Sequence, residues 1–226
     1  MLSLNVPLVG VEAQIYNDLW NAVINRKLKP GVKLEEAVLC ELYGISRTVV
    51  RKVLVIMEQA GIVHLPVNRG AYIAKPTAGE AENLVEGMHL LLTHFARELA
   101  NAPDQRRAEV HKVLSVHLQA EQQASQQAEF NTLRRLRLEA GTLLGVLAGN
   151  RLLTESYERF ATRLTLALAL YQRGSLITEG HSLMESTAKH ILAGEPDEAA
   201  ATFDTAFDML RRSLDFGVNE DVDLKA

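Results

Sequence analysis

The chain has 226 residues, of which 47% are hydrophobic and 23% charged, and it contains a single cysteine, Cys40. This composition is typical of a folded protein with room for two modest domains, and it argues against intrinsic disorder. No stretch reaches the roughly 18–20 apolar residues that cross a bilayer, and the first residues lack the basic segment of a signal peptide. One cysteine excludes an intramolecular disulfide framework. We therefore expect a cytoplasmic protein that does not enter the membrane.

The charge is distributed unevenly along the chain. The net charge of −4 divides into +3 for residues 1–77, with nine Lys or Arg against six Asp or Glu, and −7 for residues 78–226, with fifteen against twenty-two. A mildly basic first third on an acidic remainder favours contact with a polyanion in the first third only.

The first third shows the periodicities of three helices and a hairpin. A turn at Pro30-Gly31 separates the first helix from a short extended piece, Gly44 ends the second helix, and Ser46 is a suitable N-cap for the third. The predicted elements are helix 11–25, extended segment 32–34, helix 35–43, helix 46–59, and two β-rich runs, 62–65 and 71–74.

After residue 76 the pattern becomes helical throughout. Thr77 and Glu80 form a capping box, Asp104 and Asn150 are candidate N-caps, and Pro196 suits a first helical turn. The predicted helices are 77–100, 104 to about 126, 129–148, 151–172, 178–192 and 196–215. Short connections between them predict an antiparallel six-helix bundle. The fold class is thus mainly α, with domains at 1–76 and 77–226.

The order of elements in the first domain is that of a winged helix-turn-helix. In the third helix, apolar residues three and four apart form an inward stripe, which leaves Arg47, Thr48, Arg51 and Lys52 near the exposed N-terminal half. A recognition helix enters the major groove by this end, where arginine can contact guanine and hydroxyls or lysine can hold phosphates. The hairpin tip adds Arg69 and Gly70. An ordinary amphipathic helix with a solvated basic face would explain Arg51 and Lys52 alone, but the whole arrangement favours DNA binding.

The stretch from Ile15 to Ile73 resembles the DNA-binding domain of the GntR family. The residues that carry the resemblance are Pro30-Gly31, Leu34-Glu35, Leu39, Tyr43 to Thr48, Val50-Arg51, Leu54, Gly61 to Val63 and Arg69 to Ala71. The resemblance implies that Arg47 and Arg51 contact bases or phosphates, that Thr48 holds a phosphate, and that Arg69-Gly70 touches the minor groove. The family's usual proline is replaced by Val49, and its usual glutamate by Lys52, which adds a cation.

The helical domain resembles the effector domain of the FadR branch of that family, the FCD domain. Ala148 to Asn150 and Leu192 to Glu195 carry this weaker resemblance, together with the spacing of six helices. Many members hold a divalent metal through one aspartate and three histidines, but the four matching positions here are Arg137, Gly141, Met184 and Ala206. His181 lies one turn from one of them, so a shifted match restores one ligand but not four. We therefore predict no metal cofactor.

The same resemblance suggests an effector pocket without a metal. Arg137 could hold a carboxylate directly, although a solvated face formed with Arg134 and Arg135 would also explain it. Met88, Leu92 and Met184 are expected near the pocket, so the effector could be a small carboxylate or an apolar acyl compound.

The predicted function is that of a homodimeric transcription regulator, more often a repressor than an activator in this family. It would bind a pseudo-palindromic DNA operator and respond to a small-molecule effector. The alternative is a dimeric DNA-binding scaffold whose helical domain has lost effector and metal binding. A helical-bundle enzyme is not expected, because no His-x-x-x-His pair is present.

Overall fold

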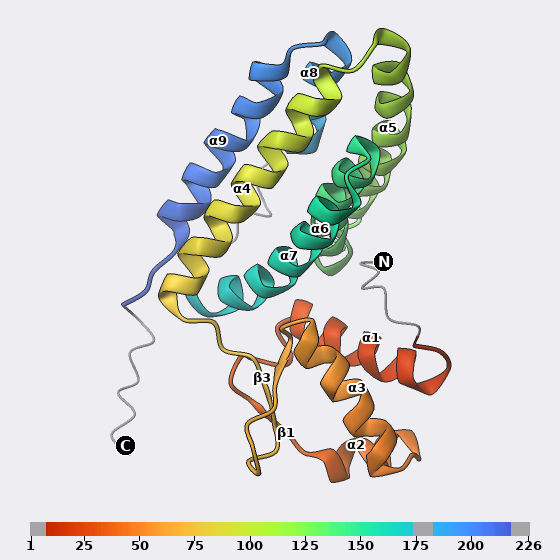
Figure 1. Cartoon of the computed structure of the whole chain (residues 1–226), viewed down its shortest axis with the longest axis vertical. Helices are drawn as coiled ribbons and strands as arrows, with labels where there is room; N and C mark the ends of the chain where they lie inside the picture. The colour runs from red at the N-terminus through yellow and green to blue at the C-terminus, as the bar shows by residue number, and fades with distance from the viewer. Residues whose placement is uncertain (1–7, 174–182, 218–226) are drawn as a thin grey trace. The chain divides into compact units, whose positions relative to one another are not determined.

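The computed structural model describes residues 8–173 and 183–217 (Figure 1). It is mainly helical, as predicted. Within these residues the helices are α1 (Val11–Ile24), α2 (Glu36–Tyr43), α3 (Arg47–Gln59), α4 (Ala78–Ala100), α5 (Asp104–Gln126), α6 (Phe130–Ala148), α7 (Arg151–Tyr171), α8 (Leu183–Ala193) and α9 (Pro196–Ser213), and the strands are β1 (Lys33–Leu34), β2 (Val63–His64) and β3 (Ala71–Ile73).

The described residues divide into two compact units. One, the helical unit, comprises residues 82–161, 173 and 183–214; the other, the N-terminal unit, comprises residues 8–81, 162–172 and 215–217. The helical unit lies within the predicted domain 77–226, whereas the last turns of α7 group with the N-terminal residues. In the N-terminal unit the Tyr171 hydroxyl donates a hydrogen bond to the Pro76 carbonyl oxygen over 2.9 Å.

The core of the N-terminal unit is built around the apolar face of α3. Val50, Val53, Leu54 and Met57 are all fully buried, and this confirms the predicted inward stripe. Gly44 follows α2 with a φ of 63°, a left-handed conformation that glycine adopts without strain and that ends the helix. This stop allows α3 to start three residues later.

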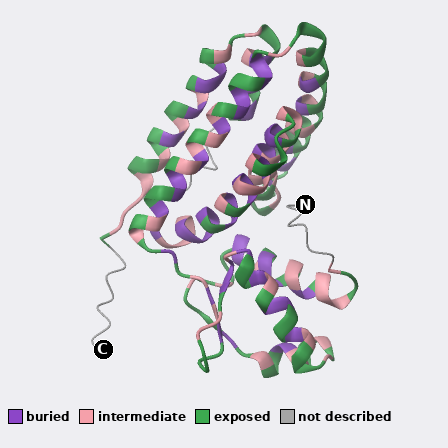
Figure 2. Cartoon of the chain, in the orientation of Figure 1, coloured by how far each residue is buried: buried purple, intermediate pink, exposed green. Residues whose placement is uncertain are grey.

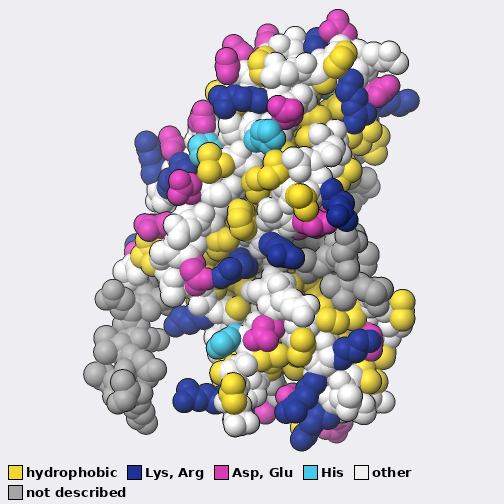
Figure 3. All heavy atoms as spheres, in the orientation of Figure 1, with side chains coloured by type: hydrophobic (Ala, Val, Ile, Leu, Met, Phe, Trp, Pro, Cys, Tyr) yellow, Lys and Arg dark blue, Asp and Glu magenta, His cyan; other side chains and the backbone are white. Residues whose placement is uncertain are grey.

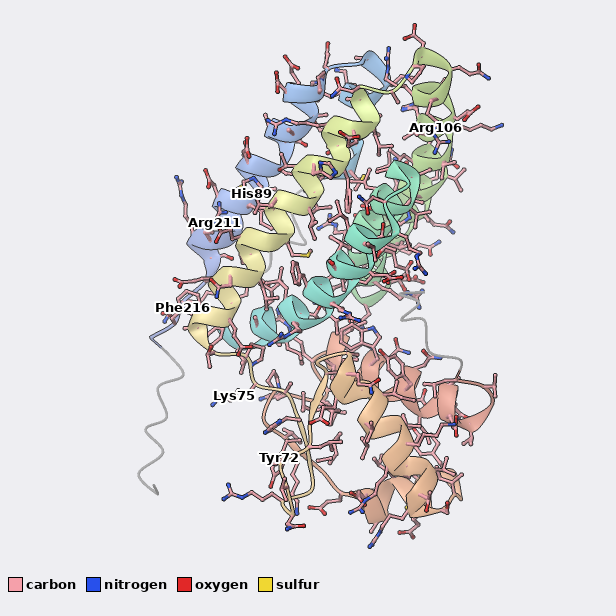
Figure 4. The ribbon with its side chains drawn as sticks, viewed as in Figure 1. Tyr72, Lys75, His89, Arg106, Arg211 and Phe216 are labelled. Carbon is pink, nitrogen blue, oxygen red and sulfur yellow. The ribbon has the colours of Figure 1, made fainter. Side chains whose placement is uncertain are left out.

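A three-stranded antiparallel sheet completes this unit. Its strand order is β1-β3-β2, so the predicted extended segment joins the predicted hairpin. Tyr72 on the central strand faces Lys33 on one side and His64 on the other. Figure 4 places Tyr72 and Lys75 on this part of the chain.

The helical unit is an assembly of antiparallel helices that bury one face each, shown in purple in Figure 2. Helix α5 packs against α6 and α8, and α8 packs against α9. Phe95, Leu114, Leu144, Ile191 and Phe203 are fully buried or nearly so. The predicted bundle therefore has a continuous apolar interior.

The helix starts agree with prediction in part. Both halves of the capping box are present, since the Glu80 carboxylate accepts from the Thr77 N–H over 3.1 Å and the Thr77 hydroxyl accepts from the Glu80 N–H over 3.2 Å. Asn150 caps α7 by accepting from the Leu153 N–H over 3.2 Å. Asp104 is not an N-cap: it is the first helical residue, and Pro103 precedes it. An acidic residue in the first turn still suits the helix dipole.

Ser46 occupies the N-cap position of α3 with extended backbone, but its hydroxyl makes no capping hydrogen bond. The orphan N–H groups of the first turn thus have no side-chain cap from Ser46. The predicted start of α8 at residues 178–182 lies outside the described residues.

Candidate nucleic-acid interface

The four predicted contact residues of α3 lie together on its solvent-exposed side. Arg47, Thr48, Arg51 and Lys52 are all exposed, whereas the neighbouring Val50 and Val53 are fully buried. The helical period produces this division, because residues on the buried stripe recur every three or four positions. The structure therefore places three cations and one hydroxyl in the first two turns of one exposed helix face.

Two of these cations share one carboxylate of α2. The Arg51 Nε lies 3.1 Å from Glu36 Oε1 and 3.0 Å from Glu36 Oε2, and the Arg47 Nε lies 3.8 Å from Glu36 Oε2. The Glu36 side chain is only 16% exposed, while both arginine side chains are 66% exposed. A mostly covered carboxylate thus anchors two arginines whose outer ends reach solvent.

Lys52 is held by a different helix. Its Nζ lies 2.8 Å and 2.7 Å from the two carboxylate oxygens of Glu12 at the start of α1. The sequence predicts Lys52 to be an added cation for DNA, but its charge is already paired within the protein. This ion pair joins α1 to α3.

The wing tip carries a cation with no ion pair or hydrogen bond to its side chain within the described residues. Arg69 and Gly70 are exposed, and Asn68 and Gly70 both have positive φ values, of 58° and 85°. The Arg69 N–H donates to the Pro66 carbonyl oxygen over 3.1 Å, which fixes the turn. The turn therefore presents the Arg69 guanidinium to solvent.

Basic and acidic side chains lie next to each other over the N-terminal unit in Figure 3, in agreement with the ion pairs of α3. The arrangement offers nitrogen donors on an exposed helix and a further cation on a hairpin. Such a surface can contact both base edges and phosphates of a duplex.

The N-terminal region matches a known family. Residues 11–73 match the family described as bacterial regulatory proteins, gntR family, over the region that contains α1 to β3. Residues 11–73 are thus similar to the helix-turn-helix region of gntR-family regulators. A curated relative, the HTH-type transcriptional regulator YdhC of Bacillus subtilis (strain 168), is 28% identical over 86 residues, which span 38% of this chain and 38% of YdhC.

Two solved structures share the fold across most of the chain. A GntR protein from Rhodococcus sp. RHA1 has a TM-score of 0.69 at 16% identity, with 90% of this chain and 97% of that chain covered. McbR/YncC of E. coli has a TM-score of 0.63 at 17% identity, with 91% and 99% covered. The fold of the N-terminal unit and that of the helical unit are therefore both found in solved structures. The matched family consists of regulatory proteins, in agreement with the prediction that the chain is not an enzyme.

The predicted apolar pocket residues lie in the interior of the helical unit. Met88 and Leu92 of α4 and Met184 of α8 are 4%, 6% and 5% exposed. These three residues are part of the packed core.

Among the described residues, no helix is long and apolar enough to cross a membrane.

Arg137 has a carboxylate partner within the protein. Its Nε lies 4.0 Å from Oε2 of Glu121 on α5, whose side chain is 4% exposed. The His117 Nε2 lies 3.3 Å from the other oxygen of Glu121 and 3.0 Å from the Leu136 carbonyl oxygen. The neighbouring Glu121 carboxylate raises the pKa of His117 against the opposing effect of burial. Arg137 thus belongs to an internal polar cluster that also contains His117 and Glu121.

The four positions that resemblance assigns to metal ligands do not fit a metal ion. Arg137, Met184 and Ala206 offer no suitable donor, and a Cβ on Gly141 would lie 2.1 Å from the Tyr157 hydroxyl oxygen. The Tyr157 ring therefore fills the space that a ligand at position 141 would need. The described residues contain no group of three or more His, Cys, Asp or Glu that could hold a metal. His181 lies outside the described residues.

Sequence reasoning missed the carboxylates that organise the cations. Glu36 and Glu12 lie 15 and 40 residues from their partners on α3, too far for any helical period to relate them. It also missed a surface cluster between α4 and α9, where His89 Nε2 lies 2.6 Å from Asp204 and His89 Nδ1 lies 3.3 Å from Arg211 (Figure 4). Only the packing of separate helices reveals these pairs.

Proposed function

We propose that this protein is a GntR-family transcription regulator that binds a specific DNA operator through α3 and the wing. In this proposal Arg47 and Arg51 contact base edges, Thr48 contacts a phosphate, and Arg69 with Gly70 reaches the minor groove. The observation that carries it is the exposure of both arginines in the first two turns of α3, above a buried stripe.

The contribution of Lys52 is smaller than its charge suggests. Because Glu12 holds its Nζ through two short contacts, transfer of Lys52 to a phosphate would leave the Glu12 carboxylate, 15% exposed, without its cation. We assign Lys52 to the joint between α1 and α3, with phosphate contact as a secondary role.

The helical unit is proposed to be an FCD-type domain of the FadR branch, which forms a homodimer and binds a small-molecule effector. Two linked recognition helices would then meet a pseudo-palindromic operator, and an effector would alter DNA affinity only if it binds one arrangement of the two DNA-binding units better. The resemblance of the helical region and the fold shared with the GntR protein from Rhodococcus sp. RHA1 support this proposal. Repression is the expected sign of regulation.

The effector chemistry is restricted by the interior of the helical unit. Apolar Met88, Leu92 and Met184 favour an acyl compound, and Arg137 favours a carboxylate. No metal is assigned, since the four expected positions do not fit one. The alternative of a scaffold without an effector is favoured by one observation, the pairing of Arg137 with the protein's own Glu121.

The DNA-binding proposal is tested by selection from a random duplex library with the purified full chain. We expect enrichment of two related half-sites whose centres lie about 10 base pairs, or a multiple of that, apart. An unenriched library after repeated rounds would contradict it. Light scattering on the same sample tests the homodimer.

The effector proposal is tested by thermal denaturation with small carboxylates and acyl-CoA thioesters, each with and without a chelator. Stabilisation that is indifferent to the chelator supports a pocket without a metal. A melting temperature that no compound changes favours the scaffold.

A further inference from the structure

The contact between Glu36 and Arg51 leaves one edge of the guanidinium open. The Arg51 Nε donates toward both Glu36 oxygens, at 3.1 Å and 3.0 Å, and the terminal nitrogens Nη1 and Nη2 make no hydrogen bond within the described residues. A guanidinium carries five N–H donors in a planar fork. With Nε held by the protein, the outward edge formed by Nη1 and Nη2 remains available to a second pair of acceptors.

That open edge has the geometry that guanine requires. Guanine offers O6 and N7 side by side in the major groove, and an arginine with two parallel donors binds both. An arginine free in solution must lose rotamer freedom to do so, since its long side chain has several soft torsions. A carboxylate that fixes Nε before binding removes part of that cost.

Glu36 itself is suited to hold Arg51 rather than to contact DNA. Its side chain is 16% exposed, whereas that of Arg51 is 66% exposed, so the arginine extends past the carboxylate into solvent. A carboxylate also repels phosphates. The Glu36 carboxylate therefore weakens the binding of DNA of any sequence, whereas the oriented Arg51 strengthens the binding of a sequence with guanine at the matching position.

We propose that Glu36 is a specificity-determining residue of the DNA-binding surface, which positions Arg51 to bind a guanine through its two terminal nitrogens. Arg47 shares the same carboxylate at 3.8 Å and is oriented by it more weakly. This inference rests on the proposed DNA-binding function and adds the residue that sets discrimination between sequences.

The test compares Glu36→Gln with wild type on the duplex enriched by wild-type selection and on a scrambled duplex of equal length. Glutamine keeps the size of the side chain but removes its charge, so the ion pair is lost with little change in packing. We expect the ratio of specific to scrambled affinity to fall about tenfold, within the range of one lost bidentate base contact. Affinity for the scrambled duplex is expected to stay equal or rise.

Glu41→Gln is the matched control, because Glu41 is an exposed glutamate of the same helix with no ion pair within the described residues. It removes the same charge, and we expect it to change both affinities by the same factor. In an Arg51→Ala background, Glu36→Gln should have little further effect on the ratio, since the group that it positions is absent. Thermal melting of each variant verifies that it is folded.

The outcomes separate the two proposals. If wild type enriches no sequence, the DNA-binding proposal fails and this inference fails with it. If wild type enriches a sequence but Glu36→Gln keeps the wild-type ratio, or lowers it equally in the Arg51→Ala background, DNA binding stands and the role of Glu36 is overturned.

Discussion

The Tyr157 ring of α7 lies against the backbone of Gly141 on α6, so closely that a Cβ at position 141 would lie 2.1 Å from the tyrosine hydroxyl oxygen. Tyr157 is 2% exposed and donates its hydroxyl hydrogen to the Leu138 carbonyl oxygen over 3.2 Å. Burial raises the pKa of Tyr157, so the ring stays neutral. Glycine at position 141 is therefore a packing requirement of this bundle.

Gly141→Ala is expected to destabilise the protein, by about 1–3 kcal/mol, because the added methyl group overpacks a buried contact. Gly79→Ala is the matched control: a Cβ at position 79 of α4 meets no atom within 4 Å, so this variant should gain about 0.5 kcal/mol from the helix preference of alanine. Urea denaturation measures both. Equal effects of the two changes would contradict the close packing.

Removal of divalent metals is expected to leave the melting temperature unchanged. The reason is that the four positions at which the resemblance expects metal ligands are occupied by residues without a suitable ligand atom, namely Arg137, Gly141, Met184 and Ala206. Differential scanning calorimetry with and without a chelator checks this. A large decrease on chelation, reversed by one added metal, would show that another set of ligands operates in this chain.

The salt dependence of DNA binding should separate Arg69 from Lys52. Arg69 has no ion-pair partner within the described residues, so Arg69→Ala should reduce the slope of log affinity against log salt by about one. Lys52 is held by Glu12, so Lys52→Ala should leave the slope nearly unchanged. Fluorescence anisotropy at several salt concentrations gives both slopes. A larger change for Lys52 would place its charge on a phosphate.

The pair His117–Glu121 predicts a pH-dependent stability of the helical unit. The pKa of His117 is raised in the folded chain, chiefly by the Glu121 carboxylate beside it, above its usual value of 6.5. The protonated form is therefore favoured by folding. This contribution is complete below pH 6.5 and is lost as pH rises through the folded-state pKa.

Thermal melting between pH 6 and pH 9 tests this contribution. His117→Gln should lose more stability at pH 6 than at pH 9, whereas His94→Gln, which removes an exposed histidine of the same unit, should shift both ends equally. A wild-type profile retained in His117→Gln would show that other groups determine the pH dependence.

Arg137 is expected to bind added carboxylates better when Glu121 no longer competes for it. Glu121→Gln removes the buried charge 4.0 Å from the Arg137 Nε. Stabilisation by a carboxylate effector should then increase, and Arg137→Ala should abolish it. Thermal-shift titration measures both. A response unaffected by either change would place the effector away from Arg137.

The sequence predicts the fold well where local chemistry decides. The stop at Gly44, the buried stripe from Val50 to Met57 and the capping box at Thr77 all follow from residue type and spacing, and the structure confirms them. These features depend on residues within a few positions of each other. The same holds for the exposure of Arg47 and Arg51.

The partners of those arginines could not be predicted in the same way. Glu36 and Arg51 lie on different helices, and their contact depends on how α2 packs on α3. The closeness of Tyr157 to Gly141 likewise depends on the packing of α7 on α6. Such contacts between elements have no periodic signature in one sequence, so the electrostatics of the surface emerged only from the fold.

The most direct test of the proposed DNA recognition is the affinity of Arg51→Ala for the enriched duplex and for a scrambled duplex at one salt concentration. We predict that Arg51→Ala loses at least about tenfold in affinity for the enriched duplex. Its affinity for the scrambled duplex should stay within about threefold of wild type, because the lost arginine contacts a base and not a phosphate. Equal losses on both duplexes, or none on either, would contradict the assignment of α3 as the helix that reads the sequence.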